Sequence, residues 1–222
     1  MLTIKDLGYW YSHPDDALFT NVNLSFEAGQ SYAVVGESGS GKTTFLSLVA
    51  GLDTPKAGRI ELNGKDIRKM GLTNYRKHSV SIVFQAYNLF NYMSPVNNVL
   101  TAMAITNSKH QGDKAYAKQL LAKLGLTEDQ MGQNVTHLSG GQQQRVAIAR
   151  AMGCDADLVV ADEPTGNLDE ANTKEVVELF QQLAHEENKC VIIVTHETNV
   201  AAACDHSYRL AHKQFTMEQP TA

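Results

Sequence analysis

The stretch Gly36–Thr44 reads GESGSGKTT and fits the pattern G-x-x-x-x-G-K-[ST], a glycine-rich turn between a strand and a helix. Small residues allow several backbone N–H groups to turn toward one anion, and the positive end of the following helix adds to the attraction. Lys42 supplies a mobile cation for the outer phosphates, and the Thr43 hydroxyl suits a hard ion such as Mg²⁺. We therefore interpret the stretch as a binding site for a nucleoside triphosphate.

The residues on either side of this loop support that interpretation. Ser31–Val35 is a short apolar run typical of a buried strand, and Thr44–Ala50 has the composition of a helix. The alternative is a Gly/Ser-rich turn that contains a lysine by chance, which leaves the strand and helix signals unexplained.

Composition limits the class of protein. The 222 residues carry 19 Lys and Arg against 24 Asp and Glu, a formal net charge of −5, so we expect no nucleic-acid partner. The three cysteines lack the spacing of a metal site or a disulfide framework, which favours free thiols in a reducing compartment. Because the first residues do not read as a signal peptide and no apolar run approaches the roughly 20 residues that cross a bilayer, we expect a soluble, cytoplasmic chain.

Short runs that either alternate apolar and polar residues or are mainly apolar predict strands on both sides of the phosphate loop. The runs are Leu2–Leu7, Val22–Phe26, Val80–Phe84, Leu158–Ala161 and Cys190–Thr195. Asn63-Gly64, which follows Arg59–Leu62, predicts a hairpin turn. We expect the last residues of the chain, Thr216–Ala222, to be frayed.

Residues 86–136 differ in character from the strand-rich parts around them. Lys114–Leu124 places apolar residues at helical intervals, so we expect a mostly helical insertion. Its beginning, Tyr87–Val99, holds more aromatic residues than a plain linker. Two interpretations stay open for this part, a contact face for a partner and a locally packed loop.

A second anion site is indicated by Leu138–Arg145, which reads LSGGQQQR. Ser139 is a good N-cap for a helix that continues through Gln142–Met152, and Gly140 and Gly141 leave backbone N–H groups unobstructed at the positive helix end. Taken alone, the segment is equally typical of a flexible cap.

Polar residues follow two of the predicted strands. Asp162 and Glu163 end Leu158–Ala161, where a Mg²⁺ ligand and a carboxylate that polarises water would belong beside a phosphate loop. His196 directly follows the predicted strand Cys190–Thr195, at the corresponding end of that strand. As isolated residues, the acidic pair would be solvated charges and the histidine a structural residue.

Together these motifs resemble the nucleotide-binding subunits of ATP-binding-cassette (ABC) transporters along essentially the whole chain. GESGSGKT is similar to Walker A, LSGGQQQR to the signature, LVVADEP to Walker B and GNLD to the D-loop. The resemblance implies an α/β P-loop NTPase fold for the single domain 1–222. By this resemblance the domain would have a RecA-like core, an N-terminal antiparallel β subdomain (together about residues 1–86 and 145–222) and a helical signature subdomain (about 87–144).

The resemblance also implies roles for individual residues. Adenine would stack on Tyr11, or on Trp10 beside it. Glu163 would be the general base and His196 would contact the γ-phosphate. The residues that would bind ATP are Gly36, Glu37, Ser38, Gly39, Ser40, Gly41, Lys42, Thr43, Thr44 and Gln85. Mg²⁺ would be held by Thr43, Gln85 and Asp162. The γ-phosphate of a second subunit's ATP would be bound by Ser139, Gly140, Gly141 and Gln142.

The partners implied are a second copy or a paralogous subunit, joined head to tail around two ATP molecules, and a transmembrane permease at the inner face of the cell membrane. The permease contact would follow Gln85. DEPTGNLD resembles the group of macrolide-efflux, lipoprotein-release, cell-division and antimicrobial-peptide-resistance ATPases, so we expect an export-type system. An amino-acid-type importer ATPase and a soluble ABC ATPase that transports nothing are the alternatives. Two departures from the family pattern are Asn97 in place of Glu, and Glu197 with no Asp-Gly turn after it.

Overall fold

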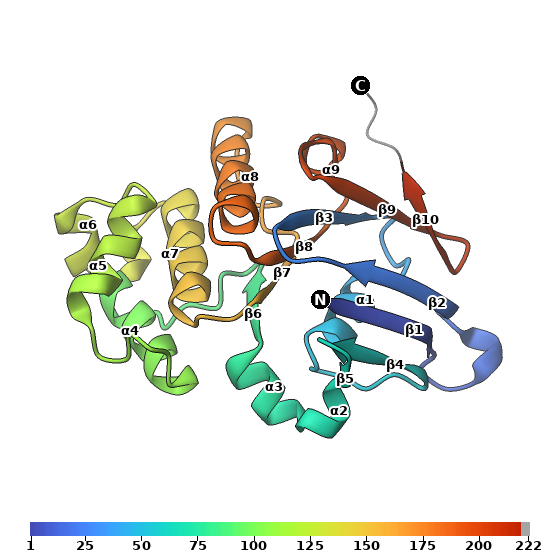
Figure 1. Cartoon of the computed structure of the whole chain (residues 1–222). Helices are drawn as coiled ribbons and strands as arrows, with labels where there is room; N and C mark the ends of the chain where they lie inside the picture. Colours follow the sequence, from blue (N-terminus) through green and yellow to red (C-terminus); the bar gives the residue numbers. More distant parts are fainter. Residues whose placement is uncertain (219–222) are drawn as a thin grey trace.

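The structure, a computed structural model, describes residues 1–218 and contains two β-sheets. The larger sheet crosses the middle of the molecule in the order β10, β9, β3, β8, β7, β6 (Figure 1). Its strands are β3 (Gln30–Val35), β6 (Val80–Phe84), β7 (Leu158–Asp162), β8 (Cys190–Thr195), β9 (His206–Ala211) and β10 (Gln214–Glu218). Neighbours pair in parallel except β10, which runs antiparallel to β9.

The parallel strands are rich in buried apolar residues because both faces of this sheet are covered. In β3, Tyr32 and Val34 face one hydrophobic cluster while Ala33 and Val35 face another. Strands β7 and β8 alternate in the same way, so each strand contributes to two cores.

The first core joins the two sheets through α1 (Lys42–Val49). The smaller sheet is antiparallel, and its strands in order are β2 (Phe19–Phe26), β1 (Leu2–Tyr9), β4 (Ala57–Leu62) and β5 (Lys65–Asp66). Phe45 of α1 lies edge-on to Phe19, with ring centroids 6.3 Å apart. The predicted hairpin at Asn63-Gly64 is confirmed, with φ of 50° and 78° at these two residues.

The second core lies under the helices of the opposite face. α8 (Glu170–His185) and α9 (Thr198–Ala203) cover the sheet, and α7 (Gly140–Gly153) packs beside β6 (Figure 1). The helices α4 (Pro95–Thr106), α5 (Lys114–Lys123) and α6 (Glu128–Gly132) gather around α7 at the far end. The predicted helical insertion is therefore confirmed. The shorter segments are η1 (Pro14–Asp16), α2 (Ile67–Met70), α3 (Leu72–His78) and η2 (Val135–His137).

Several predicted elements need correction. α1 begins at Lys42 rather than Thr44, and α4 starts at Pro95, inside the segment Tyr87–Val99 for which the sequence predicts a contact face or a packed loop. The expected fraying of the C-terminal residues is wrong for Thr216–Glu218, which belong to β10, because Phe215 anchors that strand against Phe45 with centroids 4.8 Å apart. Gln219–Ala222 lie outside the described residues.

The C-terminal hairpin forms without an Asp-Gly turn. His212 and Lys213 adopt φ of 49° and 65° between β9 and β10. These values are uncommon for residues other than glycine, so the pairing of the two strands must compensate for the strain.

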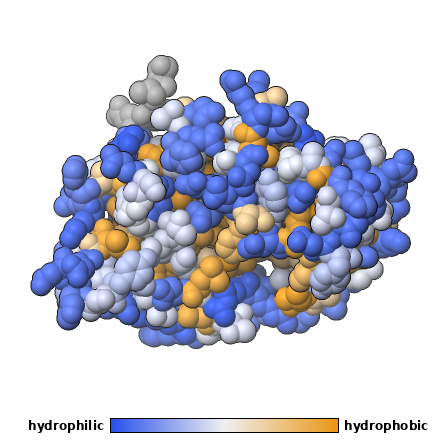
Figure 2. Space-filling view, turned by 180° about the vertical axis from the view of Figure 1, so that it is seen from behind, coloured by the Kyte–Doolittle hydropathy of each residue, from blue (hydrophilic) through white to orange (hydrophobic). Residues whose placement is uncertain are grey.

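The surface seen from behind is mainly hydrophilic, with hydrophobic patches in its middle and lower part (Figure 2). Within residues 1–218, no helix combines the length and hydropathy needed to span a membrane. Cys154, Cys190 and Cys204 are free, and burial raises the pKa of the Cys190 and Cys204 thiols to about 12, which leaves these two unreactive.

Candidate functional site

The phosphate loop connects β3 to α1 and closes tightly on itself. Gly39 and Gly41 adopt φ of 78° and 105°, a conformation that residues with a side chain rarely adopt. A Cβ at Gly36 would lie 2.6 Å from the carbonyl oxygen of Leu210, so only glycine fits where the loop passes β9. The glycine spacing found in the sequence therefore has a steric cause in this fold.

Lys42 lies over the loop. Its Nζ donates hydrogen bonds to the carbonyl oxygens of Gly36 (2.8 Å) and Glu37 (2.9 Å), and the side chain is buried. No carboxylate pairs with this ammonium group in the described part of the chain. An unpaired buried cation held only by carbonyl groups is well suited to bind an anion. Ser38 lines the cavity described below, and the buried hydroxyl of Ser40 has no hydrogen-bond partner among residues 1–218.

Thr43 and Asp162 lie 119 positions apart in the sequence but meet in the fold. The Thr43 hydroxyl donates to Oδ1 of Asp162 at 3.3 Å, because α1 starts beside the end of β7. Burial raises the pKa of the Asp162 carboxyl, the hydrogen bond from Thr43 opposes the rise, and Glu163 adds to it. A cation beside this carboxylate would offset the cost of burying its charge.

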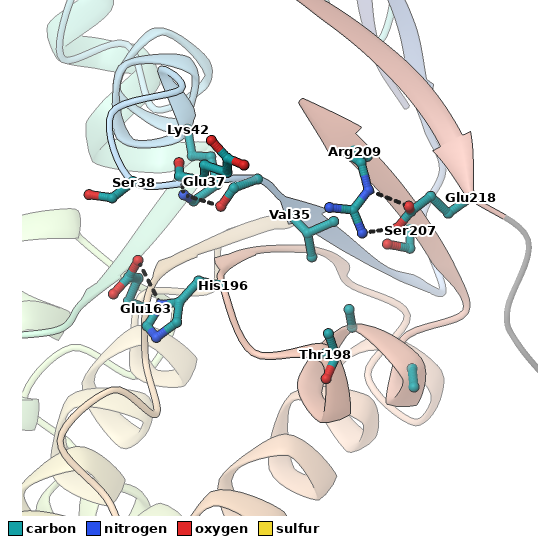
Figure 3. Close-up of a pocket in the computed structure, with 13 residues that line it drawn as sticks. Val35, Glu37, Ser38, Lys42, Glu163, His196, Thr198, Ser207, Arg209 and Glu218 are labelled. Atoms are coloured by element: carbon teal, nitrogen blue, oxygen red, sulfur yellow. Dashed lines mark hydrogen bonds and ion pairs between the residues drawn. The ribbon is translucent and has the colours of Figure 1, made fainter. Parts of the chain in front are cut away.

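Glu163 and His196 form the second pair at this edge of the sheet. Oε1 of Glu163 lies 3.2 Å from Nδ1 of His196. Glu163 has φ of 44°, and its backbone N–H donates to the carbonyl of Val194 in β8. The two side chains point toward each other, with Lys42 and Glu37 nearby (Figure 3).

Glu163 and His196 line a cavity of about 660 Å³ together with Lys42 and Glu37. It extends from the phosphate loop past His196 to β9 and β10, where Arg209 forms an ion pair with Glu218 (Figure 3). Its lining residues are Val35, Gly36, Glu37, Ser38, Lys42, Glu163, His196, Thr198, Ala201, Ala202, Ser207, Arg209 and Glu218. The structure therefore brings three predicted parts together, namely the phosphate loop, Glu163 and His196.

Of the three predicted Mg²⁺ ligands, Gln85 does not lie beside Thr43 and Asp162. Its side chain is exposed and lies against Gly166, where an added Cβ would be 2.9 Å from Nε2 of Gln85. Asn167 Nδ2 donates to the Gln85 carbonyl at 3.2 Å. No hydrogen bond joins the Gln85 side chain to Thr43 or Asp162 within residues 1–218.

The signature segment is a capped helix terminus away from the phosphate loop. Ser139 Oγ accepts from the backbone N–H of Gln142 (3.3 Å), and Gln142 Oε1 accepts from the N–H of Ser139 (2.9 Å). A Cβ at Gly141 would lie 2.6 Å from Oδ1 of Asn172, and a Cβ at Gly140 would lie 3.1 Å from the Tyr87 hydroxyl. Neither glycine borders the cavity at the phosphate loop.

The aromatic residues before the loop divide into buried and exposed ones. Tyr9 packs in the core, and its hydrogen bond to Asp53 (2.6 Å) together with burial raises the pKa of Tyr9 to about 12. Tyr11 is 67 % exposed, and its hydroxyl lies 2.9 Å from Oγ1 of Thr44. Trp10 is half-buried. The ring beside the phosphate loop is therefore that of Tyr11.

Comparison with known proteins gives a family match. The family model described as "ABC transporter" matches residues 19–166. The chain belongs to the ABC transporter family of ATP-binding proteins. As an ABC ATPase it binds and hydrolyses ATP.

Individual ABC proteins are similar over most of the chain. The uncharacterized ABC transporter ATP-binding protein YclH of Bacillus subtilis (strain 168) is 54% identical over 222 residues, which is 100% of this chain and 98% of YclH. The lipoprotein-releasing system ATP-binding protein LolD 1 of Rhodopseudomonas palustris is 38% identical over 193 residues and 85% of each chain.

Solved structures of an ABC cassette confirm the predicted fold class. The dimeric structure of MJ0796, a bacterial ABC transporter cassette, superposes with a TM-score of 0.87 at 30% identity and covers 100% of both chains. A dimeric post-hydrolysis state of MJ0796 bound to ADP and Pi gives 0.86 at 29% identity, again over 100% of both chains. The roles assigned to single residues stay predictions.

Two residues of this ABC ATPase were missed by sequence reasoning. Glu197, noted only as a departure from the family pattern, accepts a hydrogen bond from the buried Thr165 hydroxyl at 2.5 Å. Asn172 packs against Gly141 and is held by Asp169. Glu197 thus links the turn 164–169 to the residues after His196, and Asn172 links the same turn to Gly141. Nothing in the local sequence indicates either contact.

Proposed function

We propose that this ABC ATPase closes around ATP as a head-to-tail dimer and drives an export-type membrane permease. One observation carries the proposal. The chain has two sites suited to bind an anion, the phosphate loop at Lys42 and the helix N-terminus at Ser139. They belong to separate surfaces of one molecule. A two-fold arrangement lets each loop face the helix terminus of the partner, so that nucleotide joins the subunits.

The site residues then have distinct tasks. The backbone of Gly36–Thr44 and the Lys42 ammonium bind the phosphates, and the Tyr11 ring stacks on adenine. Glu163 accepts the proton of the attacking water, while His196, which lies 3.2 Å from Glu163, orients that carboxylate and contacts the γ-phosphate. Ser139, Gly140, Gly141 and Gln142 act on the partner's ATP.

The oxygen atoms at the loop suit Mg²⁺. Thr43 and Asp162 already lie within hydrogen-bond distance, and the raised pKa of Asp162 marks a carboxylate that a cation would stabilise. We assign these two residues to the ion and Gln85 as a third ligand once its side chain leaves Gly166. When bound, Mg²⁺ neutralises charge on the phosphates.

The permease contact is assigned to Tyr87–Val99. Tyr92 is 76 % exposed, whereas Asn98 is buried and holds the segment by bonds to Phe90 and Ser94. Arg150 of α7 donates to the carbonyl oxygens of Tyr87 and Asn88, so this surface is tied to the signature helix. The similarity to a lipoprotein-releasing ATPase supports an export-type system on the cytoplasmic face of the membrane.

Subunit complementation tests the shared site. Lys42→Ala removes one half of each site and Ser139→Arg blocks the other, so each variant alone is expected to lose ATPase activity. Mixed dimers contain one composite site in which Lys42 and Ser139 are both intact. An equal mixture should therefore regain up to about a quarter of wild-type activity, because half of the dimers are mixed and each has one good site.

The control is each variant mixed with itself at the same total concentration. Absence of rescue, with both variants folded and with Ser139→Arg still binding ATP, would contradict the head-to-tail arrangement. Full activity of Ser139→Arg alone would show that the site is complete within one chain.

A further inference from the structure

The charges of this chain are strongly segregated. Residues 54–127 hold eleven of the 19 Lys and Arg but only three of the 24 Asp and Glu, a net charge of +8, which leaves −13 on the rest. The basic residues are Lys56, Arg59, Lys65, Arg68, Lys69, Arg76, Lys77, Lys109, Lys114, Lys118 and Lys123. The overall charge of −5 therefore conceals a basic part of the molecule.

Four of these cations gather on β5, α2 and α3, which pack together along the lower edge of the molecule (Figure 1). We call Lys65, Lys69, Arg76 and Lys77 the basic edge. None of the four has a carboxylate partner within residues 1–218, whereas the nearby Arg68 is paired with Asp66. Unpaired cations at this density repel one another, so the basic edge is suited to an external anion.

Exposed apolar side chains lie beside these cations. Leu52 is 48 % exposed and follows Gly51, whose carbonyl accepts a hydrogen bond from Arg76. Ile105 is 60 % exposed on α4, two residues before Asn107, whose side-chain amide is 2.9 Å from Lys77 Nζ. Cations next to exposed leucine and isoleucine are typical of surfaces that rest on a lipid interface.

We propose that the basic edge binds the anionic phospholipid headgroups of the membrane surface. A flat bilayer meets only this edge, whereas a long polyanion such as duplex DNA would also approach the part of the chain with charge −13. The proposal rests on the proposed function in one respect. The permease surface Tyr87–Val99 leads into α4, which contacts α3, so a permease bound there would hold the basic edge near the bilayer.

Vesicle sedimentation with the isolated chain tests the proposal. Vesicles of equal parts phosphatidylglycerol and phosphatidylcholine are expected to bind the wild type. Vesicles of phosphatidylcholine alone are expected not to bind it. Each cation near an anionic surface contributes about a fivefold gain in partitioning, so Lys65→Gln, Lys69→Gln and Lys77→Gln combined should weaken binding about a hundredfold. High salt should weaken wild-type binding, because it screens exposed charges.

The matched control removes the same charge elsewhere. The control variant combines Lys174→Gln on α8, Lys189→Gln just before β8 and Lys213→Gln in the β9–β10 turn. This triple variant should bind the anionic vesicles within a few-fold of wild type. Equal losses in the two triple variants, no binding of wild type to the anionic vesicles, or tighter binding to duplex DNA than to those vesicles would overturn the proposal. ATPase rescue in the Lys42→Ala and Ser139→Arg mixture needs no vesicles, so it tests the proposed function separately.

Discussion

Oε1 of Glu163 lies 3.2 Å from Nδ1 of His196, although 33 positions separate the two residues in the sequence. They follow β7 and β8, which pair in parallel, so both side chains reach the same edge of the sheet. The left-handed backbone of Glu163 turns its carboxylate toward the cavity. This relationship places a carboxylate beside an imidazole nitrogen that can hold it in one orientation.

The first prediction concerns Glu163 as the base. Glu163→Gln keeps the size and polarity of the side chain but cannot accept a proton, so we expect phosphate release to fall by about 10²–10⁴. Binding of ATP should survive, and the ATP-bound dimer should accumulate because the ligand stabilises the state that binds it. Phosphate release and molecular mass measured on one sample test both expectations, with Glu186→Gln as the exposed control. A near-normal rate would transfer the role of base to His196.

The second prediction concerns adenine binding. Loss of the ring in Tyr11→Ala should weaken ATP binding by about 1–3 kcal/mol, the range for a base stacked on an aromatic side chain. Tyr11→Phe keeps the ring and removes only the contact with Thr44, so it should bind nearly as wild type. Calorimetric titration of both variants and of Trp10→Ala measures the difference. A larger loss in Trp10→Ala than in Tyr11→Ala would assign the stacking to Trp10.

The third prediction concerns the segment before α4. Asn98 is fully buried, donates to the carbonyls of Phe90 and Ser94 and accepts from the N–H of Phe90. Asn98→Ala leaves the partly buried Phe90 N–H without its partner and removes one of the two hydrogen bonds at each of the two carbonyls, which should lower the free energy of unfolding by about 1–3 kcal/mol. Urea denaturation measures the change. Asn97→Ala is the matched control on the exposed side, and an equal loss in both variants would contradict the assigned role of Asn98.

The fourth prediction concerns Asp205 and pH. Burial raises the pKa of the Asp205 carboxyl, but hydrogen bonds from the Ser31 backbone, His185 and the Ser31 hydroxyl outweigh it, so the net pKa lies below the ordinary value. A depressed carboxyl pKa stabilises the fold above the unfolded value of about 3.9, and that contribution is lost as pH falls through the folded pKa.

Asp205→Asn should therefore be less stable than wild type near neutral pH by about 1–3 kcal/mol, and the difference should shrink below about pH 4. Thermal unfolding across this pH range measures it. Asp157→Asn, whose side chain is 70 % exposed, should stay within about 0.5 kcal/mol of wild type throughout. A gap between Asp205→Asn and wild type that is constant with pH would exclude the carboxyl charge as its cause.

The sequence by itself determined the phosphate loop, the capped terminus at Ser139, the hairpin at Asn63-Gly64 and the strands around them. Each is a local pattern. Glycine positions decide which turns are allowed, a capping serine satisfies backbone groups three residues away, and strand composition reflects burial on both faces. Such causes act within a few residues, so they can be recognised before the chain is folded.

Only the tertiary structure decided which distant groups meet. The bonds from Asn98 to Phe90, from Ser31 to Asp205 and from Thr165 to Glu197 join residues whose own neighbourhoods give no sign of a partner. The C-terminal hairpin is held by Phe215 packing on α1 rather than by its turn residues, and the basic edge forms because β5, α2 and α3 pack side by side. Contact across the fold depends on how sheets and helices stack, and that is a property of the whole chain.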